Sequence, residues 1–483
     1  MGTQAMNTTH QLMNRRLSGV LLHPTSLPSQ TQDASCIGDL GSASRTFIDW
    51  LHAGGFGLWQ MLPIGQVGLG NSPYSSQSSF AIEPMLISIK DLVEERFLPS
   101  STLKISQQDR ATKSSRCDWR KARAFKIPRL QMAFNRFIQK QSGRSAFKRF
   151  ENEHSDWLGP WCTWIAEYTE DSPEYHAFVQ YLLNLQWQRM RQYARKKKVS
   201  LIGDLPIFCG AQSADVTADA HLFRLNRQGN PTVVTGVPPD TFSRNGQLWG
   251  HPHYRWSAHR KEGYRWWCHR VRTALERFDL LRIDHFVGFV HAYEISADAK
   301  NARSGKWGST PGRELLKALR ASIGPLPFIA EDLGNVTGKV DRLRKDFGLP
   351  GMRILQWAFN SRTSKDLPEN YPLDAVVYPG THDNDTVSGW WRSLPQHARR
   401  RFKSLTGTGG AMAPMAMIDL AIESRAHTAI IQAQDLLALG RSARMNTPGV
   451  PSGNWRWRLE SGQLNQRLAR KLYKKNSDAQ RLP

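Results

Sequence analysis

The sequence predicts an α/β fold of the (β/α)8, TIM-type barrel, and three observations support this prediction. Eight short apolar segments along the 483 residues have the length and composition of buried strands. Helical patterns separate several of them, so strand and helix alternate. Three of the strands run directly into carboxylate side chains, as expected where strands end in a common pocket. Eight is also the number of strands in such a barrel.

The first barrel unit is expected near the start of the chain. Residues 19–23, Gly-Val-Leu-Leu-His, form an apolar run that ends at Pro24, and a second proline, Pro28, keeps the following segment in a loop. Residues 43–53 have helical periodicity and end at a Gly-Gly pair, and residues 56–62 form the next apolar run. The order β-α-β implies that these two strands are parallel neighbours.

Two insertions are expected within the barrel. We expect residues 1–16 to be a polar leader and residues 17–483 to form a single catalytic barrel. The first insertion, at about residues 90–198, is charged and largely helical, and the second, at about residues 209–279, combines rim loops with a helix. Its stretch 227–256 is expected to be loop throughout, since Gly and Pro recur there beside Trp and Gln, as in a lid over a site. Packing rather than ligand binding is expected of the first insertion's tryptophans, Trp119, Trp157, Trp161, Trp164 and Trp187.

The later elements continue the alternation less regularly. Helices are expected at residues 313–321 and around 416–425. The remaining strands are expected at residues 200–208, 280–286 and 327–334, at 352–359, from residue 375 and, as the last strand, at 443–446.

Composition and charge bear on the class of protein. No run of about 18 apolar residues exists, and the first residues lack the apolar core of a secretory signal, so we expect a soluble cytoplasmic protein without a membrane partner. The 65 Lys and Arg residues against 41 Asp and Glu give a net charge of +24, which raises the possibility of a nucleic-acid partner. The basic residues spread over several segments instead of forming one patch, so solvated helix faces are the favoured interpretation. The five cysteines are scattered without a CxxC pair and are expected to be reduced thiols.

Carboxylates follow three of the predicted strands. Asp284 ends the run 280–286, Glu331 ends the run 327–334, and Asp383 lies in the segment Thr-His-Asp-Asn-Asp after the strand at 375. In a barrel of parallel strands, the residues at the carboxyl ends converge on one pocket. Acids at such junctions also cap the following helices. Because three strands share the feature, we favour a common pocket.

An acid-rich pocket with aromatic neighbours suits the chemistry of the glycosidic bond. That reaction needs one carboxylate at the anomeric carbon and one protonated carboxyl that releases the leaving oxygen. We expect Asp284 to be the nucleophile, held ionised by Arg282 two residues earlier on the same strand face. Glu331 is the expected proton donor, with its pKa raised by apolar surroundings and a nearby carboxylate. Asp383 is expected to bind sugar hydroxyls and help distort the ring, with His382 donating hydrogen bonds beside it.

A metal-dependent hydrolase is the main rival use of clustered acids and histidines. The segments 382–385 and 251–253 contain candidate ligands, but the chain has neither an HExxH motif nor an EF-hand calcium loop. We therefore expect no catalytic metal and no cofactor.

Several short motifs resemble those of one enzyme family. The chain is similar to the 4-alpha-glucanotransferases, the amylomaltases or disproportionating enzymes of glycoside hydrolase family 77. The similarity spans nearly the whole chain in order. Its motifs are HPTSLPS at 23–29, WQMLPIG at 59–65, NSPY at 71–74, GDLPIF at 203–208, GVPPD at 236–240, GQLWG at 246–250, RIDHF at 282–286, AEDLG at 330–334, GTHDNDT at 380–386, ARMNTPG at 443–449 and GNWRWR at 453–458.

The resemblance implies a barrel of the alpha-amylase clan and a retaining double displacement on alpha-1,4-glucan donors and acceptors. It implies that Asp284 is the nucleophile, Glu331 the general acid/base and Asp383 the transition-state stabiliser. A 4-hydroxyl of another glucan, rather than water, would then intercept the covalent glucosyl enzyme, which a rim of loops that excludes water would explain. The family's sugar contacts correspond to Ser72, Tyr74, Asp240, Gln247, Trp249, Arg282, His382 and Asn454.

The sequence departs from the family pattern without losing a catalytic carboxylate. Thr241 stands where many members have Tyr, Val287 where an Arg is frequent, and His251 where Asn is expected. Gln212 and Thr217 stand where Asp and Trp are common. These changes bear on chain-length preference and on the ratio of transfer to hydrolysis. Two alternatives stay open at this point: an alpha-glucan hydrolase of the same clan, and a non-enzymatic protein that binds glucan or polyanions.

Overall fold

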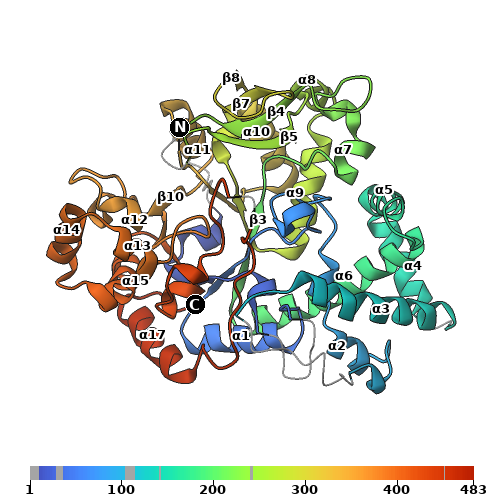
Figure 1. Ribbon diagram of the computed structural model, residues 1–483, viewed down its shortest axis with the longest axis horizontal. Coiled ribbons are helices and arrows are strands. Elements are labelled where there is room, and N and C mark those ends of the chain that lie inside the picture. Colours follow the sequence, from blue (N-terminus) through green and yellow to red (C-terminus); the bar gives the residue numbers. More distant parts are fainter. Residues whose placement is uncertain are drawn as a thin grey trace, which may run out of the picture.

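A closed barrel of eight parallel strands forms the centre of the molecule, and helices surround it (Figure 1). The strand order is β10-β11-β12-β1-β2-β3-β6-β9. A parallel bridge between Ala330 and Gly351 links β9 to β10 and closes the ring. The predicted fold class is therefore confirmed. The computed structural model describes residues 10–28, 36–103, 115–140, 143–239, 243–334, 336–450 and 452–483.

The barrel strands are short and almost entirely buried, which explains why they read as apolar runs rather than as alternating patterns. Their carboxyl ends share one side of the barrel because all neighbouring pairs are parallel. The strands are β1 (Leu17–Leu21), β2 (Leu58–Gln60), β3 (Ser200–Leu205), β6 (Leu280–Ile283), β9 (Phe328–Ala330), β10 (Met352–Ile354), β11 (Val376–Tyr378) and β12 (Thr428–Gln432).

The prediction of the last strand at 443–446 was wrong. The eighth strand is β12, a fully buried Thr-Ala-Ile-Ile-Gln run that pairs with both β1 and β11. Residues Arg441–Ala443 form a short 3-10 helix instead, followed by irregular chain. The physical reason is burial, because Arg444 and Asn446 would place polar groups in a barrel wall, whereas Ile430 and Ile431 are fully buried there.

Amphipathic helices cover the outside of the barrel. The predicted helices at 43–53, 313–321 and around 416–425 are confirmed, with small shifts of their ends. No single helix in the described ranges is long and apolar enough to cross a membrane, although the bent pair 396–406 and 410–423 passes by length and composition. The main covering helices are α1 (Ser42–Ala53), α6 (Pro173–Lys196), α9 (Arg265–Arg277), α10 (Gly312–Ile323), α11 (Gly338–Asp346), α15 (Ala413–Glu423) and α17 (Gln466–Asp478).

Additional helices lie between β2 and α6 and project to one side of the barrel (Figure 1). They are α2 (Ile89–Glu94), α3 (Trp119–Ile138), α4 (Arg144–Glu153) and α5 (Ser155–Ala166). The five tryptophans predicted to pack in this region are all buried, with at most 7% of their surface exposed. Four of these tryptophans belong to the same hydrophobic core as the barrel, whereas Trp119 packs in a separate, smaller cluster.

A second, antiparallel sheet lies beyond the barrel at the top of Figure 1, in the order β5-β4-β7-β8. The prediction that 227–256 is loop throughout was wrong, because two of these strands lie within it. β4 pairs with β5, close in sequence, and also with β7, which follows the barrel strand β6, so part of the pairing is nonlocal. The strands are β4 (Val233–Val237), β5 (Gln247–Pro252), β7 (His291–Ser296) and β8 (Gly305–Ser309).

One buried arginine fastens the end of the chain to the base of the barrel. Arg481 is fully buried, and its guanidinium donates five hydrogen bonds to main-chain carbonyls. Burial lowers its pKa to about 9, so the group is still charged at neutral pH. The acceptors lie at the start of β1, in the last turn of α15 and between α15 and β12: Leu17, Ile422, Ser424, Ala426 and His427.

Replacing this arginine is expected to destabilise the whole fold. Arg481→Ala should lower the free energy of unfolding by about 3 kcal/mol, because it leaves buried carbonyls without a charged donor. Urea unfolding measures the change. Arg467→Ala, on the exposed face of α17, is the control and should change the same quantity by less than about 0.5 kcal/mol. Equal effects of the two substitutions would contradict this role of Arg481.

Candidate active site

A cleft of about 970 Å³ lies at the carboxyl ends of the barrel strands. Asp240 lies outside the described residues, and every other site residue predicted from the sequence lines this cleft. These residues are Ser72, Tyr74, Gln247, Trp249, Arg282, Asp284, Glu331, His382, Asp383 and Asn454. The barrel thus brings together side chains from six separate parts of the chain, as the convergence of strand ends predicts.

A buried arginine joins two carboxylates at the floor of the cleft. Nη1 of Arg282 lies 2.8 Å from both carboxylate oxygens of Asp204 and 2.9 Å from Oδ1 of Asp284. The side chain of Arg282 is 4% exposed and that of Asp204 is fully buried, whereas the side chain of Asp284 is 26% exposed. Of the two acids, Asp284 is therefore the one that a ligand can reach.

The sheet register explains why these groups meet. Asp204 on β3 pairs directly with Arg282 on β6, so both side chains point to the same side. The main-chain N–H of Asp284 continues the ladder with a 3.0 Å hydrogen bond to the carbonyl of Leu205. The main chain of Asp284 is thus fixed by the sheet, and its carboxylate is held by Arg282.

Asp204 belongs to the site, although sequence reasoning did not include it. Its Oδ2 also accepts a 2.8 Å hydrogen bond from the hydroxyl of Tyr74. Burial raises the pKa of Asp204 to about 7 and the Asp284 charge adds to the shift, while Arg282 opposes it. The sequence feature that could have indicated this residue is an acid within the apolar run 200–208. In the barrel it lies at the same level as Arg282.

Glu331 follows β9 and is held by the turn after Asp284. The main-chain N–H of His285 donates a 2.6 Å hydrogen bond to Oε2 of Glu331. His285 has φ +51°, a left-handed conformation that is uncommon outside glycine and that aims this N–H at the carboxyl. Burial raises the pKa of Glu331 well above its ordinary value, and the charge of Asp284 adds to the shift, while Arg282 opposes it. Glu331 therefore holds its proton at a pH where an ordinary carboxyl is ionised.

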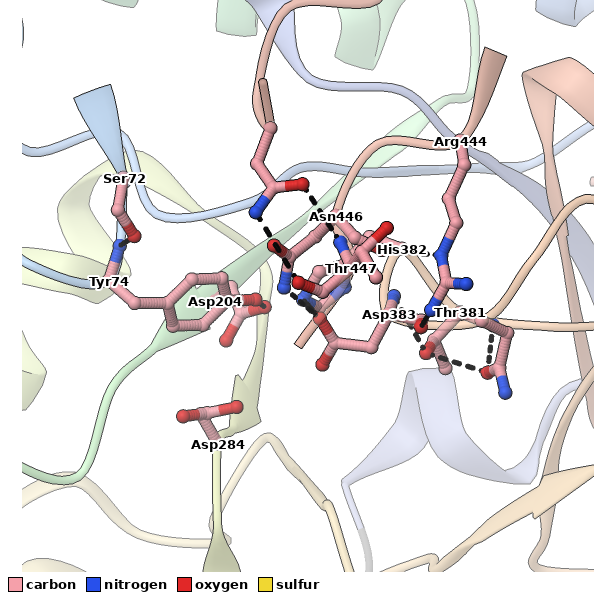
Figure 2. A network of polar contacts seen from close by, with 12 residues as sticks. Ser72, Tyr74, Asp204, Asp284, Thr381, His382, Asp383, Arg444, Asn446 and Thr447 are labelled. Carbon is pink, nitrogen blue, oxygen red and sulfur yellow. Dashed lines mark hydrogen bonds and ion pairs between the residues drawn. The ribbon is translucent and has the colours of Figure 1, made fainter. Parts of the chain in front are cut away.

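Asp383 stands in a polar network after β11 (Figure 2). Nδ2 of Asn446 donates a 2.5 Å hydrogen bond to its Oδ1, and Nε2 of His382 lies 3.4 Å from the same oxygen. Arg444 donates a 2.5 Å hydrogen bond to the main-chain carbonyl of Asp383. Asn446 and Arg444 were not among the predicted site residues, since the segment that carries them was interpreted as a strand.

Figure 2 places Asp284 at the end of its strand, apart from the network around Asp383. The side chain of Asp383 is 44% exposed. Within the described part of the chain, its Oδ2 has no hydrogen-bond partner, so this oxygen is available to a ligand. The two acids therefore offer carboxylate oxygens to the cleft from different elements.

Histidines and aromatic rings complete the walls. The ring of Tyr74 stacks on His382 with centroids 5.3 Å apart, and Trp249 meets the ring of His285 edge-on at 4.9 Å. Burial lowers the pKa of His382, and it lowers those of His285 and His251 to about 4. These histidines are therefore neutral hydrogen-bonding groups at neutral pH. His251 and Val287, two of the unusual residues of this sequence, also line the cleft.

Asn454 lies on the rim and braces the loop that carries it. Its side chain accepts a 3.0 Å hydrogen bond from the N–H of Thr447 and donates one of 2.9 Å to the carbonyl of Val450. Both ends of the amide are thus used within the rim. Like the hydroxyl of Tyr74 and the guanidinium of Arg282, the side-chain amide of Asn454 is thus engaged within the protein.

Together these groups suit acid/base and nucleophilic chemistry on a polar, hydroxyl-rich ligand. One carboxyl of the pair Asp284 and Glu331 is held beside a guanidinium, and the other keeps a proton. Neutral histidines, amides and ring faces surround them. Among the residues that the structure describes, no three His, Cys, Asp or Glu side chains are grouped as metal ligands would be.

Comparisons with known proteins agree with this geometry. The model of the 4-alpha-glucanotransferase family matches residues 22–171 and 165–465. The 4-alpha-glucanotransferase of Thermus thermophilus is 39% identical over 93% of this chain and 96% of its own length. That of Aquifex aeolicus is 39% identical over 92% and 96%, respectively. The amylomaltase from Streptococcus agalactiae, solved in complex with acarbose, superposes with a TM-score of 0.92 at 30% identity and covers 97% of this chain and 100% of its own.

Removing the central guanidinium is expected to destabilise the protein in a pH-dependent way. Arg282→Met should lower the free energy of unfolding by about 3 to 5 kcal/mol, because Asp204 loses its buried counter-charge. Without Arg282 the raised pKa of Asp204 rises further, so the folded variant keeps a proton that the unfolded chain loses near about pH 4. Stability then falls as pH rises.

Urea unfolding of Arg282→Met and the wild type at pH 6 and pH 8 measures this effect. The loss of stability relative to the wild type should be larger at pH 8. The double variant Asp204→Asn/Arg282→Met is the control, since it removes Asp204 as a titrating group and should therefore show a smaller difference between the two pH values. The same loss at both pH values for Arg282→Met would contradict the interaction.

Proposed function

Because the chain belongs to the 4-alpha-glucanotransferase family, we propose that it transfers a segment of a 1,4-alpha-glucan to the 4-hydroxyl of an acceptor glucan or glucose. The reaction is a retaining double displacement through a covalent glycosyl enzyme. The observation that carries the proposal is the pair of carboxyls in one cleft: Asp284 is bound to Arg282, and Glu331 has its pKa raised by burial.

In the first step, the carboxylate of Asp284 attacks the anomeric carbon of the donor. Glu331 gives its proton to the glycosidic oxygen, the bond to the leaving glucan breaks, and a glycosyl ester forms on Asp284. In the second step, the 4-hydroxyl of the acceptor attacks the same carbon and Glu331, now ionised, takes its proton. The ester bond breaks, and both carboxyls return to their first state.

The other groups of the cleft bind and shape the sugar. Asp383 accepts hydrogen bonds from ring hydroxyls through its unengaged Oδ2 and stabilises the oxocarbenium-like transition state. His382 adds neutral hydrogen bonds, because its lowered pKa keeps it uncharged. Proposed sugar contacts also include Ser72, Tyr74, Asp240, Gln247, Trp249, Arg282 and, through the rim loop, Asn454.

Transfer rather than hydrolysis is proposed because the matched relatives are named as transferases over nearly the full length of both chains. The cleft also has a rim that can hold an acceptor next to the ester. The rim includes residues of β5 and residues 446–450 and 454–455, and these line the cleft. An acceptor held there would compete with water for the ester.

The first test is incubation of the purified protein with maltotriose alone, with the products separated by length. We expect glucose together with a ladder of longer maltooligosaccharides. Asp284→Asn should lower this activity by roughly 10⁴-fold, because it removes the nucleophile. Asp478→Asn, at an exposed position on α17, is the matched control and should leave it unchanged.

Two outcomes would contradict the proposal. Glucose and maltose without longer products would mean hydrolysis. A full ladder from Asp284→Asn would mean that another group is the nucleophile.

The pH dependence of transfer should report the proton on Glu331. The first step needs protonated Glu331, so kcat/KM should fall on the alkaline side as this proton is lost. Because burial raises the pKa of Glu331, the alkaline fall in kcat/KM should lie well above the ordinary carboxyl range of about pH 4 to 5. Rates with maltotriose between pH 4 and pH 10 measure it. An alkaline limb within the ordinary range would contradict the role of Glu331.

A further inference from the structure

A tryptophan outside the catalytic network is exposed on the wall of the cleft. Trp307 on β8 has 37% of its surface exposed and lines the same cleft as Asp284 and Glu331. Single exposed apolar residues are ordinary on protein surfaces. A large ring that is exposed to water on the wall of a binding cleft is a better indication of a ligand contact. Covering such a ring with an apolar face of the ligand is favourable.

The ring of Trp307 is held by its neighbours before any ligand arrives. Tyr293 lies directly opposite on β7, with ring centroids 5.2 Å apart, and His291 meets the indole edge-on at 4.7 Å. Tyr293 is itself buried in a small apolar cluster with Val234 and Ile295. A ring fixed in this way loses little conformational freedom on binding, so stacking on it is more favourable.

Trp307 lies away from the sugars at the point of reaction. In the sheet order β5-β4-β7-β8, it stands on one edge strand and Trp249 on the other. Three strand spacings separate these edges, about 14 Å at the usual spacing. Trp249 is the one next to the catalytic turn, through its contact with His285. The ring of Trp307 contacts the rings of His291 and Tyr293, on the neighbouring strand β7.

We propose that Trp307 forms an outer sugar subsite, where it stacks on a glucosyl unit beyond those that flank the scissile bond. This inference rests on the proposed function. The C–H face of a pyranose ring is apolar and flat enough to cover an indole, whereas the hydroxyls at its edge remain in water. The subsite makes long alpha-1,4-glucans better substrates than short ones, because only a long chain reaches both Trp307 and the catalytic carboxyls.

The test compares maltoheptaose with maltotriose in Trp307→Ala and in Trp307→Phe. For Trp307→Ala, the ratio of kcat/KM for maltoheptaose to that for maltotriose should fall about tenfold, the size expected for one lost aromatic contact. Trp307→Phe keeps an apolar ring and should restore most of the ratio. Tyr473→Ala removes a comparably exposed ring on α17 and should leave the ratio unchanged.

A binding measurement separates this inference from the proposed reaction. In the Asp284→Asn background, calorimetric titration with maltoheptaose should give a Kd about tenfold higher when Trp307→Ala is added. If the wild type gives no transfer but this shift is found, the subsite stands and the proposed reaction fails. An unchanged length ratio with an unchanged Kd, or an equal loss for both sugars, would overturn the subsite.

Discussion

The arrangement of the cleft depends on one buried charge, the guanidinium of Arg282. It sits between a fully buried carboxylate, Asp204, and one that faces the ligand, Asp284. A buried charge is tolerated only when it is paired, and here the β3–β6 register supplies the pair. The same pairing fixes the carboxylate of Asp284 beside a positive charge. One interaction thus bears both on the stability of the barrel interior and on the position of the proposed nucleophile.

The two carboxyls of the cleft differ in their surroundings over a short distance. Asp284 has a guanidinium at 2.9 Å, whereas Glu331 receives a main-chain N–H but is buried enough for its pKa to rise. His285 links the two, because its left-handed backbone follows Asp284 directly and donates to Glu331. This difference between the two carboxyls is what the proposed double displacement requires.

The barrel and most residues of the cleft could be predicted from the sequence, whereas the antiparallel sheet and the segment around Asn446 could not, and both outcomes have physical reasons. Strand ends with acids were visible because apolar runs stop abruptly at Asp284, Glu331 and Asp383. The antiparallel sheet was not, because β4 pairs with β7 across the barrel strand β6, and such pairing depends on distant residues. The segment around Asn446 resembled a strand locally, although its polar groups serve Asp383 instead. Asp204 lies in the apolar run 200–208, and only the register places it against Arg282.

The central claim is that Asp284 forms the covalent bond to the sugar while Glu331 transfers the proton. The most direct measurement uses Glu331→Gln with alpha-maltosyl fluoride, whose leaving group needs no proton, so the ester forms but its breakdown lacks a base. Mass spectrometry of the digested protein should find a maltosyl adduct on the peptide with Asp284. An adduct on another residue, or none while the fluoride is consumed, would contradict the account.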